Sequence, residues 1–170
     1  MVASRVMDAK KKFEGKHIVV LDRNDWEFVE RKKAKEAVAI VALTDDGEII
    51  LTEQYRAPVD ARVIDLPAGL IEQYEAEETA WRELEEETGF TCDEVVLLAS
   101  SPTSPGITSE IVHLYRAKGV RRVGKGGGVG GEDIDVHLVR LTDMPTWLES
   151  QKILVDAKIW AGLYFSSQST

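Results

Sequence analysis

Short apolar runs and alternating polar and apolar positions extend along most of this chain and predict several strands. Residues 37–43 (AVAIVAL) form a continuous apolar run typical of a buried central strand. The turn at residues 44–47 (TDDG) leads into residues 48–56 (EIILTEQYR), and together they predict a hairpin. Further strands are predicted at residues 63–66, 94–98, 111–117 and 136–140.

Two longer segments have helical rather than strand periodicity. Ala76, Ala80 and Leu84 form one apolar stripe, and Gly89 supplies a helix stop. Residues 156–166 (DAKIWAGLYFS) predict a second helix whose apolar face holds Ile159, Trp160, Leu163 and Tyr164. With a short helix expected from Pro145 to Glu149, the pattern predicts an α/β chain.

The N-terminal region reads differently from the rest. Residues 17–21 (HIVVL) and 26–31 (WEFVER) predict two strands joined by the polar turn at residues 22–25. A two-stranded ribbon is only marginally stable alone and must pack on something else. We therefore expect a ribbon region at residues 1–35 and a main domain at residues 36–170.

Composition narrows the class of protein. A chain of 170 residues with 44% hydrophobic residues is sufficient for one well-packed domain. Its formal charge of -9 argues against a nucleic-acid polymer as partner, since phosphate backbones require a basic surface. Cys92 is the single cysteine, which excludes an intrachain disulfide and a thiolate zinc cluster.

The start of the chain lacks the features of an export signal. Charged residues are spread through the first twenty positions without an apolar segment, so we predict no signal peptide. No apolar run approaches the length needed to cross a bilayer. The expected location is therefore the cytoplasm, with no membrane partner.

An acidic cluster on the first helix is the main candidate for chemistry. Glu83, Glu86 and Glu87 stand at i, i+3 and i+4, so they share one helix face and repel one another unless a cation lies among them. Such oxygen ligands suit Mg²⁺, with Mn²⁺ as the alternative. Read alone, the cluster is also explained as a solvated acidic face.

The residues around this cluster resemble the Nudix box, which reads Gly, five residues, Glu, seven residues, Arg-Glu-hydrophobic-x-Glu-Glu-x-Gly-hydrophobic. This chain departs from it at one point, because six residues rather than seven separate Glu75 from Arg82. The departure affects Glu75 and leaves the register of Glu83 and Glu87 intact. The matching positions are Gly69, Glu75, Arg82, Glu83, Leu84, Glu86, Glu87, Gly89 and Phe90.

The resemblance implies a Nudix α/β/α sandwich with a mixed sheet. In similar hydrolases of ADP-ribose and nucleotide sugars, an N-terminal antiparallel ribbon helps to form a homodimer that shares its active sites. Trp26 or Phe28 on the ribbon would then stack on a nucleobase. Filling a dimer interface is an equally good explanation of either aromatic residue.

The resemblance also implies a set of metal ligands: the carbonyl oxygen of Ala68, the carboxylates of Glu83 and Glu87, and Glu86 in addition. Glu86 and Arg82 are counted with the catalytic residues, and Arg82 is expected to orient the helix carboxylates by ion pairing.

Glu132 matches the general base of the ADP-ribose type, a glutamate in a Glu-Asp-Ile setting at the end of a loop. Residues 124–131, which precede it, are mostly glycine, and we interpret them as a flexible segment that lets Glu132 swing over a substrate. A plain acidic loop end is the alternative reading.

Several other residues resemble substrate-binding features of the same subgroup. Gln54-Tyr-Arg56 ends a predicted strand, and the guanidinium of Arg56 suits a pyrophosphate. Pro105 lies 15 residues beyond Phe90, as in ADP-ribose hydrolases, and Glu110 adds a carboxylate nearby. Asp156 and Lys158 resemble an Asp-x-Lys feature of nucleotide-sugar hydrolases, although a helix-start aspartate is also explained by the helix dipole.

These features predict a Mg²⁺-dependent hydrolase that cleaves nucleoside diphosphate sugars such as ADP-ribose, ADP-glucose and GDP-mannose to a nucleoside monophosphate and a sugar phosphate. Three alternatives stay open: a strict ADP-ribose hydrolase, a Nudix enzyme for triphosphates or capped RNA, and a Nudix-like domain that only binds a nucleotide.

Overall fold

Two mixed four-stranded sheets organise residues 8–168, the part of the chain that the computed structural model describes. The first sheet has the order β7 (Ala68–Leu70), β4 (Glu36–Ala42), β10 (Ile111–Lys118), β9 (Glu94–Pro102). The second has the order β12 (Ile134–Arg140), β5 (Glu48–Arg56), β6 (Ala61–Asp65), β13 (Leu154–Val155). One pair in each sheet is parallel, β4 with β10 and β6 with β13.

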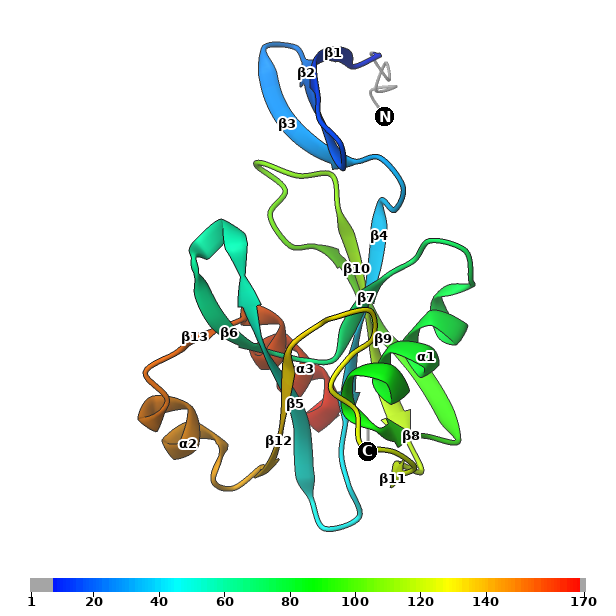
Figure 1. The fold of residues 1–170 in the computed structure, drawn as a ribbon, viewed down its shortest axis with the longest axis vertical. Coiled ribbons are helices and arrows are strands. Elements are labelled where there is room, and N and C mark those ends of the chain that lie inside the picture. Colours follow the sequence, from blue (N-terminus) through cyan, green and yellow to red (C-terminus); the bar gives the residue numbers. More distant parts are fainter. Residues whose placement is uncertain (1–7, 169–170) are drawn as a thin grey trace.

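Two helices cover opposite faces of the first sheet (Figure 1). Helix α1 (Ala76–Thr88) packs against β4 and β7, and α3 (Ala157–Gln168) packs against β4, β9 and β10. Because side chains alternate along a strand, Val38 and Ile40 of β4 lie in the core beneath α1, whereas Ala39 and Val41 lie in the core beneath α3. The expected α/β/α arrangement is confirmed.

The predicted hairpin at residues 37–56 is wrong in one respect. The turn is present, because the Thr44 N–H donates to Glu48 O over 2.9 Å. Beyond the bridge between Leu43 and Ile49, however, β4 and β5 separate into different sheets. Both strands are buried, and each finds a more extensive partner, β10 for β4 and β12 for β5. Tertiary pairing therefore overrides the local hairpin signal.

A three-stranded ribbon projects from the rest of the molecule (Figure 1). It contains β1 (Lys10–Glu14), β2 (Ile18–Arg23) and β3 (Trp26–Arg31), joined to the body beside the loop between β9 and β10. There Val29 bridges Thr108, and Trp26 Nε1 donates to Gly106 O over 3.0 Å. The polar sequence of β1 did not predict a strand. The ribbon's role in dimerisation and the division at residue 35 stay predictions.

The remaining elements are short. They are a 3₁₀ turn η1 (Ala57–Val59), β8 (Phe90–Thr91) paired with β11 (Arg121–Arg122), and helix α2 (Met144–Ser150) against the second sheet. No helix in the part of the chain that the structure describes is long and apolar enough to cross a membrane.

Helix α1 ends at Gly89, as the sequence predicts. Gly89 has a left-handed φ of 74°, and its N–H donates to Glu85 O over 2.8 Å. The backbone of Gly124 then returns to this helix end, and its N–H donates to Gly89 O over 2.9 Å. A Cβ at Gly89 would lie only 2.5 Å from Gly124 O. Both the positive φ and this close backbone approach require glycine.

We predict a graded loss of stability in three glycine-to-alanine variants. Gly106→Ala should be neutral, because a Cβ there meets open space. Gly47→Ala, with a φ of +75° and open space, should lose about 1–2 kcal/mol from left-handed strain alone. Gly89→Ala should lose more, because it adds a steric clash. Urea unfolding measures all three, and equal losses at Gly47 and Gly89 would contradict the close approach.

Candidate active site

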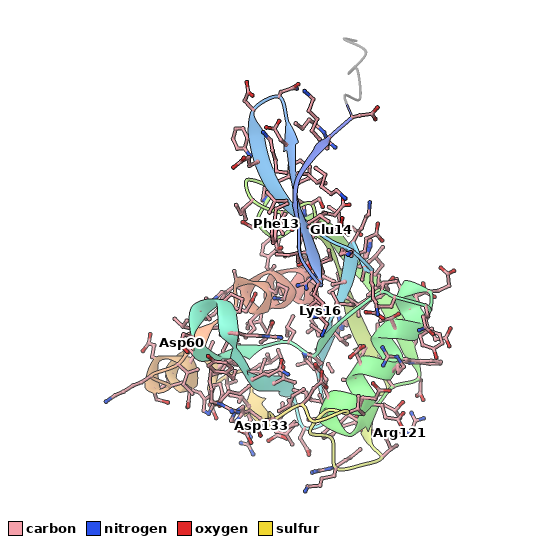
Figure 2. The ribbon with its side chains drawn as sticks, turned by 45° about the horizontal axis from the view of Figure 1, so that its top comes forward. Phe13, Glu14, Lys16, Asp60, Arg121 and Asp133 are labelled. Carbon is pink, nitrogen blue, oxygen red and sulfur yellow. The ribbon has the colours of Figure 1, made fainter. Side chains whose placement is uncertain are left out.

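A cavity of about 1480 Å³ lies between the two sheets and the helices α1 and α3. It is lined by most of the residues that the sequence singled out: Arg56, Ala68, Arg82, Glu83, Glu86, Glu87, Glu110, Glu132, Asp156 and Lys158. Trp26 and Phe28 are not among its lining residues. Figure 2 shows that Phe13 and Glu14 of the ribbon lie far from Asp133, which follows Glu132.

Glu87 is the most deeply buried carboxylate of the cluster, with 6% of its surface exposed. Its Oε2 accepts a hydrogen bond of 3.0 Å from the backbone N–H of Ala68. Burial raises the pKa of Glu87 to about 8; the Ala68 N–H opposes this rise, and the charges of Glu83 and Glu132 add to it. A positive charge bound beside Glu87 would relieve this electrostatic cost.

Glu83 lies one turn before Glu87, against β7. A Cβ on Gly69 would overlap the Glu83 carboxyl group, so only glycine at position 69 leaves room for that side chain. Burial raises the pKa of Glu83 also, although the neighbouring Arg82 works against this rise. The glycine of the motif therefore serves to admit a carboxylate.

Arg82 pairs with two of the helix carboxylates. Its Nη1 donates to Glu86 Oε2 over 2.5 Å, and its Nη2 donates to Glu83 Oε1. Its Nε is buried and has no hydrogen-bond partner among the described residues. Arg82 thus forms ion pairs with Glu83 and Glu86, and its orienting role in catalysis stays a prediction.

The shortened turn before α1 explains the position of Glu75. Glu75 is exposed at the N-cap of α1, and its carbonyl oxygen accepts from the Thr79 N–H over 2.9 Å. The ring of Tyr74, rather than the carboxylate of Glu75, faces the Arg82 guanidinium, 5.7 Å from the ring centroid. In this turn, which is one residue shorter than in the Nudix box, Glu75 thus caps the helix through its backbone, and Tyr74 contacts Arg82.

The glycine-rich segment is attached to the end of α1 and does not form a free linker. Its Gly127 N–H donates to Glu87 O over 2.8 Å, and its Gly128 N–H donates to Glu86 O over 3.0 Å. These bonds satisfy carbonyl groups that the last helical turn leaves open. Our interpretation of the whole segment as flexible is therefore wrong for this half of it.

Glu132 lies beyond this attachment, on the side of the cavity that faces the helix carboxylates. Its Oε2 accepts from the Val129 N–H over 3.1 Å, so the side chain turns back onto its own loop. Its charge contributes to the raised pKa values of both Glu83 and Glu87. The structure thus brings together the predicted metal ligands and the predicted base.

On β6, Asp65 organises two cations that line the cavity, and sequence reasoning did not identify it. Lys158 Nζ lies 3.0 Å from Asp65 Oδ2 and 2.7 Å from Asp156 Oδ2. An Arg56 nitrogen lies 3.9 Å from Asp65 Oδ2. Asp65 is 5% exposed, and burial raises its pKa even though Lys158 lowers it. The available signal was an acidic residue flanked by the apolar Val63, Ile64 and Leu66.

Glu110 occupies the rim of the cavity below the ribbon. Its Oε2 accepts from Arg31 Nε over 2.7 Å, so this carboxylate links the β9–β10 loop to the end of β3. It contributes negative charge to the cavity, but its partner in this single chain is an arginine.

The carboxylates fit a divalent cation in their chemistry. Within residues 8–168, no three acidic, histidine or cysteine side chains gather closely enough to enclose an ion. Glu83, Glu86, Glu87 and Glu132 nevertheless bring four hard oxygen donors to one cavity, where Arg82 pairs with two of them. Two of these carboxyls have raised pKa values because they are buried without sufficient positive charge.

Residues 33–157 match the family model described as the NUDIX domain. The chain belongs to the NUDIX family. The predicted family is thus confirmed, and its signature residues extend in this Nudix chain from β7 through the following turn and α1 to the start of β8.

Two curated relatives align with this Nudix chain over 124 residues. The "Methanol dehydrogenase activator" of Bacillus methanolicus is 42% identical, and the "ADP-ribose pyrophosphatase" of Bacillus subtilis (strain 168) is 38% identical. Each match covers 72% of this chain and 66% of the relative, so the chain spans slightly less than two thirds of either protein.

A solved structure of similar fold is titled "Crystal structure of ADP compounds hydrolase". It superposes with a TM-score of 0.72 at 20% identity and covers 95% of this chain and 91% of its own. At this identity the similarity establishes the fold of the Nudix domain.

Burial of Glu87 predicts a pH dependence of stability. In metal-free buffer the folded protein holds the Glu87 proton up to about pH 8, whereas the unfolded chain releases it near pH 4.5. Between these values the folded state binds more protons, so its free energy of unfolding falls as the pH rises.

Thermal unfolding in EDTA from pH 5 to pH 8 tests this dependence. Glu87→Gln should decline less steeply than the original protein, because the amide keeps an acceptor for Ala68 and does not titrate. Glu85→Gln, on an exposed position of the same helix, is the matched control. Parallel declines for Glu87→Gln and the original protein would contradict the raised pKa.

Proposed function

We propose that this protein is a metal-dependent hydrolase of nucleoside diphosphate sugars, producing a nucleoside monophosphate and a sugar phosphate. The observation that carries the proposal is the convergence of two kinds of group in one cavity. Buried carboxylates on α1 line this cavity together with the cations Arg56 and Lys158. The first kind suits a divalent cation, and the second suits phosphate oxygens.

Glu83, Glu87 and the Ala68 carbonyl oxygen would hold Mg²⁺, or Mn²⁺ in its place, with Glu86 as a further ligand. The cation would neutralise charge on the diphosphate as one bridging phosphorus–oxygen bond breaks. Gly69 keeps the space for Glu83 open, and Arg82 fixes the orientation of Glu83 and Glu86. These groups supply preorganised electrostatic stabilisation.

Glu132 would accept the proton of the attacking water. Its carboxylate is exposed to the cavity and is close enough to Glu83 and Glu87 to raise their pKa values. A carboxylate at this place can remove a proton while the water oxygen bonds to phosphorus. Its Oε2 accepts from the Val129 N–H, and a carboxylate has a second oxygen that can take the proton, so this bond orients the side chain without blocking it.

Arg56 would bind the diphosphate with its guanidinium, which is 43% exposed and only loosely paired with Asp65. Lys158 is more fully neutralised by Asp65 and Asp156, so it suits a hydroxyl or a single phosphate oxygen. Asp156 and Lys158 are the feature that favours nucleotide sugars over ADP-ribose alone.

A homodimer formed through the ribbon would complete the base-binding end of the cavity. Trp26 and Phe28 lie outside the cavity of a single chain, so either aromatic could reach a nucleobase only in the cavity of a second subunit. Trp26 is 62% exposed and therefore available for such stacking. Size-exclusion chromatography with light scattering tests the dimer.

We predict that Glu83→Gln and Glu87→Gln each lower turnover by ~100-fold or more at saturating Mg²⁺, because each removes a charge that the reaction requires. Circular dichroism should stay native-like. The exposed Glu85→Gln is the control and should keep full turnover. Near-normal turnover of Glu87→Gln would rule out the metal assignment.

The substrate class is tested with a phosphatase-coupled phosphate assay on ADP-ribose, ADP-glucose, GDP-mannose, UDP-glucose and nucleoside triphosphates, with and without Mg²⁺. We expect Mg²⁺-dependent cleavage of several nucleotide sugars. In Lys158→Gln, cleavage of the other nucleotide sugars should fall relative to cleavage of ADP-ribose. Cleavage of ADP-ribose alone would support the strict hydrolase instead. If the folded, metal-supplied original protein cleaves none of these substrates, the result would support a domain that only binds a nucleotide.

A second candidate function is activation of a dehydrogenase. The observation that favours it is the 42% identity, over 124 residues, to the protein named for activating methanol dehydrogenase. Methanol oxidation by a methanol dehydrogenase, measured with and without this protein, tests the idea. A rise that Glu87→Gln abolishes would tie activation to the same cavity.

A further inference from the structure

Arg62 of β6 pairs with carboxylates of β5, its neighbour, and of β12, the strand beyond β5, on the sheet face opposite to Asp65. Its Nε donates to Glu53 Oε1 of β5 over 2.5 Å. Its Nη2 donates to Asp135 Oδ2 of β12 over 2.5 Å, and its Nη1 donates to Asp133 Oδ2 over 3.3 Å. One guanidinium thus joins β6, β5 and the residues that begin β12.

Glu53 gives this cluster a fixed base in the sheet. It is 8% exposed, and it accepts a second hydrogen bond of 2.9 Å from His137 Nε2. The His137 ring in turn lies 5.2 Å from the ring of Trp147 on α2. Arg62 also donates to the Glu53 carbonyl oxygen over 3.1 Å. The Arg62 end of the cluster is therefore held in place by both main-chain and side-chain partners.

The carboxylates at the other end of the cluster are exposed. The side chains of Asp133 and Asp135 are 90% and 64% exposed, and they flank the buried Ile134. Asp133 follows Glu132 directly. Arg62 therefore adds a side-chain attachment of this end of the glycine-rich loop, beside the backbone pairing of Ile134 and Asp135 with β5, just as the Glu86 and Glu87 carbonyl groups attach its other half to α1.

We propose that Arg62 is a positioning residue for Glu132: by holding Asp133 and Asp135 against β5 and β6, it fixes the end of the loop that carries the base. This inference rests on the proposed function, in which Glu132 accepts a proton. Arg62 does not line the cavity, so it acts through the loop and not on the substrate.

Charge explains why the side-chain attachment depends on Arg62. Without Arg62, three carboxylates would face one another, and among the described residues His137 is the only other basic group hydrogen-bonded to them. Glu53 is buried, and the backbone of Asp135 is paired with it in the sheet, whereas Asp133 precedes β12 and its side chain is 90% exposed. Repulsion would therefore move the loop end and Glu132 with it.

Steady-state kinetics on ADP-ribose at saturating Mg²⁺ test the proposal. Arg62→Gln should lower kcat roughly 10- to 100-fold, because a small misplacement of a reacting group has effects of this size. KM should change little, since Arg56 and Lys158 stay in place. Arg140→Gln, at the exposed opposite end of β12, is the matched control and should behave as the original protein.

A double-mutant cycle separates positioning from general stabilisation. In the Glu132→Gln background, adding Arg62→Gln should change kcat by about twofold or less, because the group that Arg62 positions is already lost. If the two losses instead multiply, Arg62 does not act through Glu132 and the proposal is overturned.

A second variant covers the case in which Arg62→Gln does not fold. Asp133→Asn combined with Asp135→Asn keeps the Arg62–Glu53 pair and removes the charges on the loop side. It should lower kcat in the same range as Arg62→Gln does. In the Glu132→Gln background it should likewise change kcat by about twofold or less. Unchanged kcat in this variant would overturn the proposal.

Hydrogen exchange tests the attachment without any catalysis. Peptides spanning residues 129–135 should exchange faster in Arg62→Gln, or in the double aspartate variant, than in the original protein or in Arg140→Gln. Equal exchange would refute the attachment. Absence of turnover in the original protein would instead refute the proposed function, so the two failures are distinguishable.

Discussion

The carboxylate of Glu87 lies buried against the backbone N–H of Ala68, and this contact ties the helix carboxylates to the edge of the first sheet. It requires Gly69 beside it, because any side chain there would overlap Glu83. It also concentrates negative charge where one arginine, Arg82, pairs with two of the carboxylates. This burial is electrostatically unfavourable, but it presents oxygen ligands at fixed positions. A divalent cation stabilises such an arrangement.

The same helix controls the loop opposite its ligands. Carbonyl groups of Glu86 and Glu87 accept hydrogen bonds from Gly127 and Gly128, so the two residues that present carboxylates to the cavity also anchor the loop through their backbone. The loop's exposed tip, between this anchor and Arg62, carries Glu132. A base that must approach the helix carboxylates is thereby held on a short tether, and its own charge limits how close it rests to Glu83 and Glu87 without a cation.

Strand β6 contributes both to the cavity and to the attachment of the loop that carries Glu132, because successive side chains of a strand point to opposite faces. Asp65 faces the cavity and holds Lys158 and Arg56, while Arg62 faces outward and holds the loop end. In a small domain, one strand that is paired on both sides can thus orient groups on its two faces.

The family, the signature helix and most of the strands could be predicted without the structure, since these depend on local periodicity and on a long motif. Most of the charged residues that line the cavity could be named in the same way. Three features became visible only in the folded chain: β4 and β5 separate into different sheets, Tyr74 rather than Glu75 lies beside Arg82, and Asp65 and Arg62 organise their neighbours. The physical reason is that strand pairing and buried ion pairs join residues far apart in the chain, and no local pattern encodes their partners.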